Sequence, residues 1–398
     1  MTVVRLRENG PWTEHELTPE QATALAAAGL ARVAPGPRPG LWRVRDNGLV
    51  GAARIGRGRD PIEIRVEPKT PIDRLLFLLG HAQNPRGWRQ EEVDAGARPD
   101  LLPALAHAFA RAAERALRQG VLLGYRETEE ALPVVRGRIR MIDQIRRRHG
   151  LPVPVEVRYD DYTADIPENR LLLAAAHRLL VLPGVPPGTR RLLRHLPLRL
   201  DGVERLVPGR PPPAWTPSRL NIRYHSALGL AALVLRGASY ELDDGTTVRV
   251  DGLMLEMWRV FEDFVCTALA EALRPYGGTV TLQDGRHHLD RARRVKLRPD
   301  LLLTDAGGRP SIVVDVKYKA GDTPQADLYQ ILAYCTAMGL DRGYLVYASK
   351  DETLTHIVIG GGFRIVEKAL DLTSPPGELR TQITDLAHQI AVADAVPP

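Results

Sequence analysis

The chain has 398 residues, of which 44% are hydrophobic and 26% charged, a composition typical of a globular protein with two or three domains. Its net charge of +6 suits an anionic partner. No apolar run approaches the ~20 residues that span a bilayer, no signal-peptide core is present, and two cysteines exclude a disulfide scaffold and a Cys-rich zinc site. We therefore expect a cytoplasmic protein without membrane contact.

The N-terminal half divides into a β-rich and a helical region. Segments rich in β-forming residues lie between Gly and Pro breaks over residues 1–70, with one helix at 19–30. From Pro71 the apolar spacing becomes helical. Asp165 precedes one of these helices and is expected to cap it. Helices are expected at residues 72–82, 100–120 and 166–182, a strand at 153–163, and a Pro-rich linker at 207–220.

The C-terminal half has the pattern of a mixed α/β domain. A long helix is predicted from Met254 to Leu273. Two strands follow as a hairpin, VKLRPDLLLTD and PSIVVDVKYK, joined by the turn AGGR. The next helix spans residues 323–340, with Thr323 as its expected N-cap. Two further strands complete a central mixed sheet flanked by helices.

The hairpin carries the strongest chemical signal. One strand begins with Asp300, and the next contains Asp315 and Lys317. Residues two apart in a strand face the same side, so Asp315 and Lys317 point together, and antiparallel pairing can bring Asp300 beside them. Two carboxylates beside an ammonium group form a hard-oxygen site for Mg²⁺, which can activate water against a phosphodiester. The alternative is an Asp–Lys ion pair that serves only the sheet.

Three further side chains fit the same site. Glu262 on the long helix can reach the same metal ion, although an exposed helix acid explains it equally well. Gln330 and Tyr334 are four residues apart and share one helix face, where they can line the site or simply pack.

Basic residues cluster in two segments, 136–148 and 286–298. A solvated surface is the alternative to an anionic partner for each of them. Beside a nuclease site, the second cluster would contact the DNA backbone without reading bases. The candidate contacts within it are Arg293, Arg294, Lys296 and Arg298.

The order Glu262, Pro299-Asp300, Asp315-Val316-Lys317 and Gln330-x-x-x-Tyr334 resembles the PD-(D/E)xK nuclease superfamily. The segments FARAAERALRQGVLLGYRETEEALPVVRGRIRMIDQI and VRYDDYTADIPENRLLLAAAHRLL resemble the McrC family. The resemblance implies Asp300, Asp315 and Lys317 as the catalytic core, with Glu262 and the Val316 carbonyl as further metal ligands. Mg²⁺ would be the cofactor, and Mn²⁺ would substitute for it.

McrC-like proteins act with McrB, a hexameric AAA+ GTPase, so the resemblance implies a methylated-DNA endonuclease that stimulates this partner. It also implies three parts: a β-rich region at 1–70, a largely helical partner-docking region at 71–215, and a nuclease domain at 221–398. No lysine follows a glycine, so the chain lacks a GxxxxGK[ST] loop and any NTP-driven translocation requires another polypeptide. The alternatives are a non-cleaving activator of the GTPase and a stand-alone repair nuclease.

Overall fold

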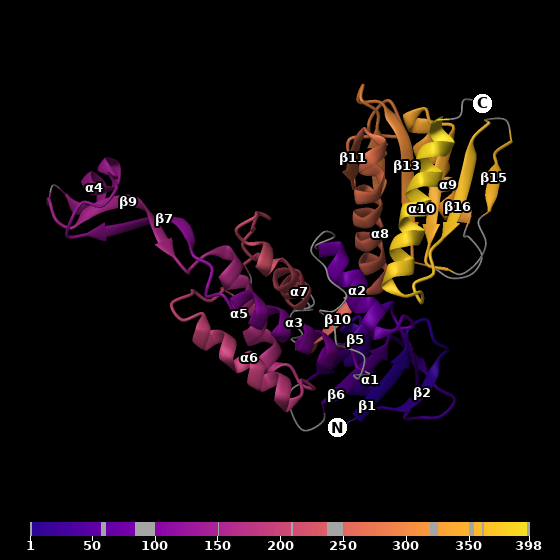
Figure 1. Ribbon diagram of the computed structural model, residues 1–398. Coiled ribbons are helices and arrows are strands. Elements are labelled where there is room, and N and C mark those ends of the chain that lie inside the picture. The colour runs from indigo at the N-terminus through magenta and orange to yellow at the C-terminus, as the bar shows by residue number, and fades with distance from the viewer. Residues whose placement is uncertain are drawn as a thin grey trace. The chain divides into compact units, whose positions relative to one another are not determined.

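The computed structural model describes residues 2–56, 61–83, 100–149, 151–207, 210–236, 250–318, 325–349, 354–359 and 362–395. The chain forms two compact units. The first combines Met1–Leu105 with Gly237–Pro398, and the second is Ala106–Arg236. Figure 1 labels the helices and strands of both units, which we take in turn.

The N-terminal region is β-rich, as the sequence predicts, and one of its strands comes from the second half of the chain. A four-stranded sheet has the order β1-β6-β5-β10, formed by β1 (Thr2–Arg7), β6 (Ile62–Glu67), β5 (Leu49–Ile55) and β10 (Val250–Glu256). The expected helix start at Met254 is therefore wrong, because residues 254–256 pair with β5. Gly51 allows this pairing, since its φ is 131° and an added Cβ would lie 2.1 Å from the Leu253 carbonyl oxygen.

A second, three-stranded sheet completes the region in the order β2-β4-β3. Its strands are β2 (Thr13–Glu16), β4 (Leu41–Asp46) and β3 (Ala31–Pro35). The helix α1 (Pro19–Ala27) begins with a capping box between Thr18 and Gln21. The helix α2 (Ile72–Gln83) packs against the later helix α8.

The second unit is a group of helices from which a narrow sheet extends. Its helices are α3 (Leu101–Leu117, beginning in the first unit), α5 (Pro167–Val181), α6 (Pro187–Arg199) and α7 (His225–Arg236), with a 3₁₀ turn η2 (Ile222–Tyr224). The expectation that Asp165 caps α5 is wrong. Ile166 occupies the N-cap position, and the Asp165 carboxylate instead binds Arg170, Arg126 and the backbone N–H of Glu204.

The narrow sheet, which we call the arm, comprises residues 124–163. It contains β7 (Gly124–Leu132), β8 (Arg138–Ile139), α4 (Met141–Arg148) and β9 (Val155–Thr163), with the strand order β7-β9-β8. Figure 1 shows the arm extending away from α5 and α6, with α4 at its far end. Asn169 fixes its base, because its Nδ2 donates to the Leu122 and Ala164 carbonyl oxygens just outside β7 and β9.

The C-terminal part is a six-stranded mixed sheet in the order β11-β12-β13-β14-β16-β15. Its strands are β11 (Thr279–Leu282), β12 (Leu301–Thr304), β13 (Pro310–Lys317), β14 (Arg342–Tyr347), β15 (Thr355–Ile357) and β16 (Arg364–Ala369). Pairing is antiparallel between β12 and β13 and parallel between β13 and β14. The expected central mixed sheet is therefore present.

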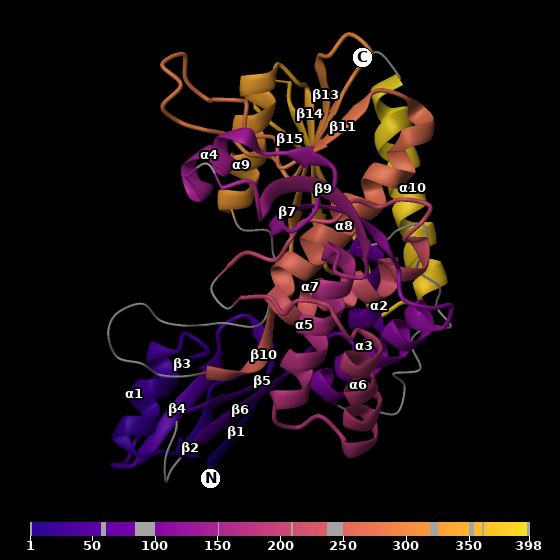
Figure 2. The ribbon, with the colours of Figure 1, turned by 90° about the vertical axis from the view of Figure 1, so that its left-hand side faces the viewer.

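Helices cover both faces of this sheet. The helices are α8 (Met257–Leu273), followed by a 3₁₀ turn η3 (Arg274–Tyr276), α9 (Gln325–Met338) and α10 (Pro376–Ala395). Figure 2 shows the strands between α9 on one side and α8 and α10 on the other. The expected N-cap Thr323 lies outside the described residues. None of the described helices is long and apolar enough to cross a membrane.

Candidate functional site

The strand pair β12–β13 places two carboxylates together. Leu301 pairs with Val314, so Asp300 lies across from Asp315 at the end of the ladder, as the sequence predicts. Asp300 Oδ2 accepts a 2.7 Å hydrogen bond from the Val316 backbone N–H. Asp315 is 1% exposed and Asp300 8% exposed. Two carboxylates are thus held in an apolar sheet, where an uncompensated charge is costly.

Lys317 supplies the nearest positive charge. It follows Asp315 by two residues on β13, and its Nζ lies 2.6 Å from Asp315 Oδ2. The ammonium occupies one acceptor direction of this buried oxygen, and a carboxylate oxygen has two. One oxygen of the pair therefore retains unused acceptor capacity.

Glu262 joins the group through a residue that the sequence analysis did not single out. The side-chain nitrogen of Gln283, directly after β11, donates to Glu262 Oε1 and also to Asp300 Oδ1 at 3.0 Å. A single amide nitrogen therefore lies between a carboxylate of α8 and a carboxylate of β12. No short-range motif could have identified Gln283, because its partners are 21 and 17 residues away.

The environment raises the pKa of each of these carboxyl groups. Burial, with the neighbouring Asp300 carboxylate, raises the pKa of Asp315 to about 7. Burial also raises the pKa of Asp300 and of Glu262, with contributions from the other acids nearby. Burial opposes the charge on Lys317, but the Asp315 carboxylate raises the pKa of this ammonium above its usual value. The group is therefore short of positive charge.

These donors are compatible with a hard cation, although the side chains are not grouped as a closed metal cage. Among the described residues, no three His, Cys, Asp or Glu side chains are close enough to hold an ion together. The carboxylates of two buried aspartates are oxygen ligands of the kind that Mg²⁺ accepts while retaining several waters. The donor set thus fits such an ion.

Gln330 and Tyr334 lie near this group without touching the carboxylates. Gln330 Nε2 donates to the Tyr334 hydroxyl at 2.8 Å, and that hydroxyl donates to the Arg298 carbonyl oxygen at 3.1 Å. Burial raises the pKa of Tyr334, and the charges of Asp315 and Asp300 add to the shift. Tyr334 therefore supports the backbone just before Asp300.

The second basic cluster forms a hairpin between Gln283 and Asp300, which we call the basic hairpin (286–298). Backbone N–H groups of Leu289 and Leu297 donate to the carbonyl oxygens of Val295 and His287, and Asp290 closes the turn. The four cationic side chains expected to contact DNA are exposed: Arg293, Arg294, Lys296 and Arg298. The hairpin therefore carries exposed positive charge in the segment that leads directly to Asp300.

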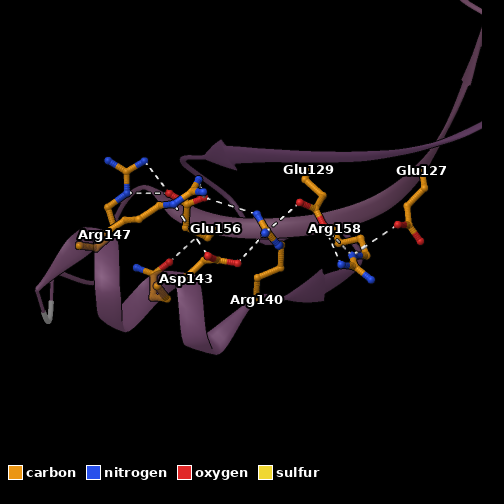
Figure 3. A network of polar contacts seen from close by, with 9 residues as sticks. Glu127, Glu129, Arg140, Asp143, Arg147, Glu156 and Arg158 are labelled. Carbon is orange, nitrogen blue, oxygen red and sulfur yellow. Dashed lines mark hydrogen bonds and ion pairs between the residues drawn. The ribbon is translucent and has the colours of Figure 1, made fainter. Parts of the chain in front are cut away.

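The first basic cluster (136–148) lies in the arm, where many of its arginines belong to an ion-pair network (Figure 3). Glu156 is 2% exposed and contacts Arg140, Arg147 and Arg148. The network continues along the arm through pairs of Arg140 and Arg158 with Glu129, Arg140 with Asp143, and Arg158 with Glu127. Glu156 is buried at the centre of this network, whereas Arg147, Arg158 and Glu127 stay largely exposed, so acidic partners offset much of the positive charge of this cluster.

The tip of the arm also exposes a group of apolar side chains. The helix α4 buries none of its residues, and its Met141, Ile142 and Ile145 are 60%, 67% and 66% exposed. Further exposed apolar side chains around the tip are Val134, Val135, Leu151 and Val153. Exposed apolar side chains grouped in this way mark the tip as a surface that a partner covers.

The comparisons with known proteins agree with the sequence resemblance. The chain is similar to a solved structure from Thermococcus gammatolerans, a half-complex of a tetradecameric assembly of McrB AAA+ hexamers with bound McrC. The identity is 18%, the TM-score is 0.57, and the match covers 99% of this chain and 100% of that chain. It is also similar to the McrBC complex of the same organism, with 19% identity and a TM-score of 0.41, over 68% of this chain and 88% of that chain. No curated protein matches. The family model of the McrBC 5-methylcytosine restriction system component matches residues 44–348, so the chain belongs to the McrBC family.

Proposed function

We propose that this chain is a Mg²⁺-dependent DNA endonuclease subunit that acts with an AAA+ GTPase partner and stimulates its GTP hydrolysis. The observation that carries the proposal is the convergence of Asp300, Asp315 and Lys317 at the end of two buried strands. Burying two carboxylates in a sheet costs stability. A catalytic use for them accounts for that cost, whereas an ion pair needs only one acid.

Asp300, Asp315 and the Val316 carbonyl would hold the metal, Glu262 would join them as a further ligand after a side-chain movement, and Mn²⁺ would substitute for Mg²⁺. When bound, such an ion polarises a phosphodiester and lowers the pKa of a coordinated water. The Lys317 ammonium stays charged at neutral pH, because the Asp315 carboxylate raises its pKa. Lys317 can therefore offset negative charge that develops on the phosphate during attack.

The basic hairpin would bind the DNA backbone. Its arginines are exposed and lie within a few residues of Asp300 along the chain. Contacts from Arg293, Arg294, Lys296 and Arg298 to phosphates would position the duplex without reading its sequence. Gln330 and Tyr334 would line the same side, with Tyr334 fixing the backbone at Arg298.

The GTPase partner would be a McrB-like hexamer that docks on the region 71–215. The family match and the solved complex of McrC with McrB hexamers support this partner. Within the region, the tip of the arm is the best docking surface, because α4 buries none of its residues and exposes Met141, Ile142 and Ile145. The nuclease domain, 221–398, would then cut DNA.

Reconstitution tests the two roles separately. The chain is mixed with its cognate AAA+ partner, GTP, Mg²⁺ and methylated or unmethylated plasmid, and both DNA cleavage and GTP hydrolysis are measured. Asp315→Ala should abolish cleavage and leave GTPase stimulation intact, because Asp315 lies far along the chain from the docking region. A wild-type chain that stimulates GTPase but cuts no DNA would instead support a non-cleaving activator.

A further inference from the structure

We propose that Gln283 is a positioning residue for the metal ligands, an inference that rests on the proposed metal-dependent function. Its side-chain nitrogen donates to Glu262 Oε1 and to Asp300 Oδ1. These two acids come from different elements, α8 and the start of β12. This amide bridges the two carboxylates.

The backbone of Gln283 is also unusual. Its φ is 52°, in the left-handed region that a residue with a Cβ rarely adopts. Its N–H donates a 3.0 Å hydrogen bond to the Asp300 carbonyl oxygen. A strained backbone of this kind persists where the surroundings fix it, often at functional sites. Here the strained turn directs the amide back toward the acids.

The physical role of the amide follows from charge. Two carboxylates that approach each other repel, and burial strengthens the repulsion. A shared N–H donor offsets it and holds Glu262 beside Asp300, so the oxygen ligands stay together before an ion arrives. Hydrogen-bond partners that orient metal ligands typically contribute 10- to 100-fold to metal affinity. We expect a loss of this size when the Gln283 amide is removed.

Two substitutions separate the amide from the strained backbone. Gln283→Met keeps the side-chain length and the Cβ but lacks the donor. Gln283→Gly also lacks the donor, but it relieves the left-handed backbone. Both should therefore weaken metal binding equally if the amide acts. Gln389→Ala is a matched control, because Gln389 is exposed on α10 and its Oε1 accepts a hydrogen bond from Lys368.

The measurement is Mn²⁺ binding to the full chain, with and without an uncleaved duplex. The electron paramagnetic resonance signal of free Mn²⁺ reports how much of the ion stays unbound. Thermal unfolding confirms that each variant folds. We expect the wild-type chain and Gln389→Ala to bind alike, both Gln283 variants to bind 10- to 100-fold more weakly, and Asp315→Asn to lose binding.

The outcomes are distinguishable. Unchanged or tighter Mn²⁺ binding in both Gln283 variants, while Asp315→Asn still loses it, overturns the role of Gln283 and leaves the proposed metal site intact. Weaker Mn²⁺ binding in Gln283→Met alone also overturns the role of the amide. Both variants lack the amide, so the difference between them would come from the backbone at residue 283. If the wild-type chain binds no Mn²⁺ in either condition, the metal-dependent function itself fails, and this inference with it.

Discussion

Lys317 Nζ lies 2.6 Å from Oδ2 of Asp315, which is two residues earlier on the same strand and is 1% exposed. The ion pair does not restore an ordinary acidity to Asp315, because burial and the neighbouring Asp300 carboxylate raise its pKa to about 7. The single ammonium group of Lys317 therefore does not fully compensate the negative charge of the two aspartates, as expected of a site that receives a further cation.

The first prediction concerns stability and pH without divalent cations. The pKa of Asp315 is near 7 in the folded chain and about 3.8 when unfolded. The folded state therefore binds the extra proton between these values, and the free energy of unfolding should fall as pH rises from about 4 to about 7. Urea unfolding of wild type and Asp315→Asn checks this. The asparagine variant should lose that contribution, and an identical pH dependence in both chains would contradict the assignment.

The second prediction concerns Lys317. Lys317→Met keeps the length of the side chain but removes its charge beside the reacting phosphate. The cleavage rate should fall by about 10²- to 10³-fold, the usual effect of losing a group that stabilises transition-state charge. Plasmid cleavage with the reconstituted complex measures it. Lys368→Met is the control, since Lys368 contacts Gln389 on the surface. Equal rates for Lys317→Met and wild type would reduce Lys317 to a structural ion pair.

The sequence predicts the strand geometry of the site well, because that geometry is local. The alternation of Asp315 and Lys317 determines which face of β13 they share, and the short hairpin brings Asp300 to them. The contact between Glu262 and Gln283 can be recognised only in the folded structure, since it joins a helix to a loop after a different strand.

The N-terminal region shows the same limit. The segment Val250–Glu256 was expected to enter a helix at Met254, because its apolar residues continue into the helical pattern. Its strand partner, β5, lies about 200 residues earlier in the chain. Only that long-range pairing identifies it as a strand. Likewise, the ion pairs of the arm depend on which arginines meet Glu156, a matter of tertiary contact.

The third prediction concerns His81, whose ring lies 5.5 Å from Phe77 and 5.4 Å from Phe264. Burial, with the charge of Arg380, lowers its pKa from 6.5 to about 4. The unfolded chain therefore binds a proton that the folded chain excludes between these values. Stability should fall as pH drops from about 6.5 to about 4, by roughly 3 kcal/mol for this group.

The replacement His81→Phe tests this, because phenylalanine keeps the aromatic packing and cannot be protonated. Its free energy of unfolding should exceed that of wild type increasingly as pH falls below 6.5. Denaturant unfolding at pH 7 and pH 4.5 measures the difference. A constant difference across this interval would show that His81 titrates normally.

The fourth prediction concerns the arm. Ile142→Ser and Ile145→Ser change two exposed side chains of α4, so stability should change by less than about 0.5 kcal/mol. Binding to the AAA+ partner and stimulation of its GTPase should both weaken, because the apolar contact is lost. Leu198→Ser is the matched control, as Leu198 is 75% exposed on α6 in the same unit. If the control and the arm variants bind the partner equally well, the tip is not the docking surface.

The fifth prediction concerns DNA. Arg294 is the chosen target, because it lies outside the left-handed backbone position that Arg293 occupies with a φ of 57°. The Arg294 backbone N–H still binds Asp290 Oδ1 after Arg294→Ala, so the hairpin turn is kept. Losing one phosphate contact should reduce the slope of log affinity against log salt by about 0.9. Fluorescence anisotropy with a labelled duplex between low and moderate salt measures that slope.

The control for this experiment is Arg309→Ala. Arg309 is exposed in the turn between β12 and β13, at the opposite end of these strands from Asp300. Its loss removes the same charge from the chain, so it lowers the net charge of +6 equally. A smaller slope for Arg294→Ala alone therefore reports a local phosphate contact, whereas equal slopes for both variants would show that only the overall charge matters and that the basic hairpin does not contact the duplex.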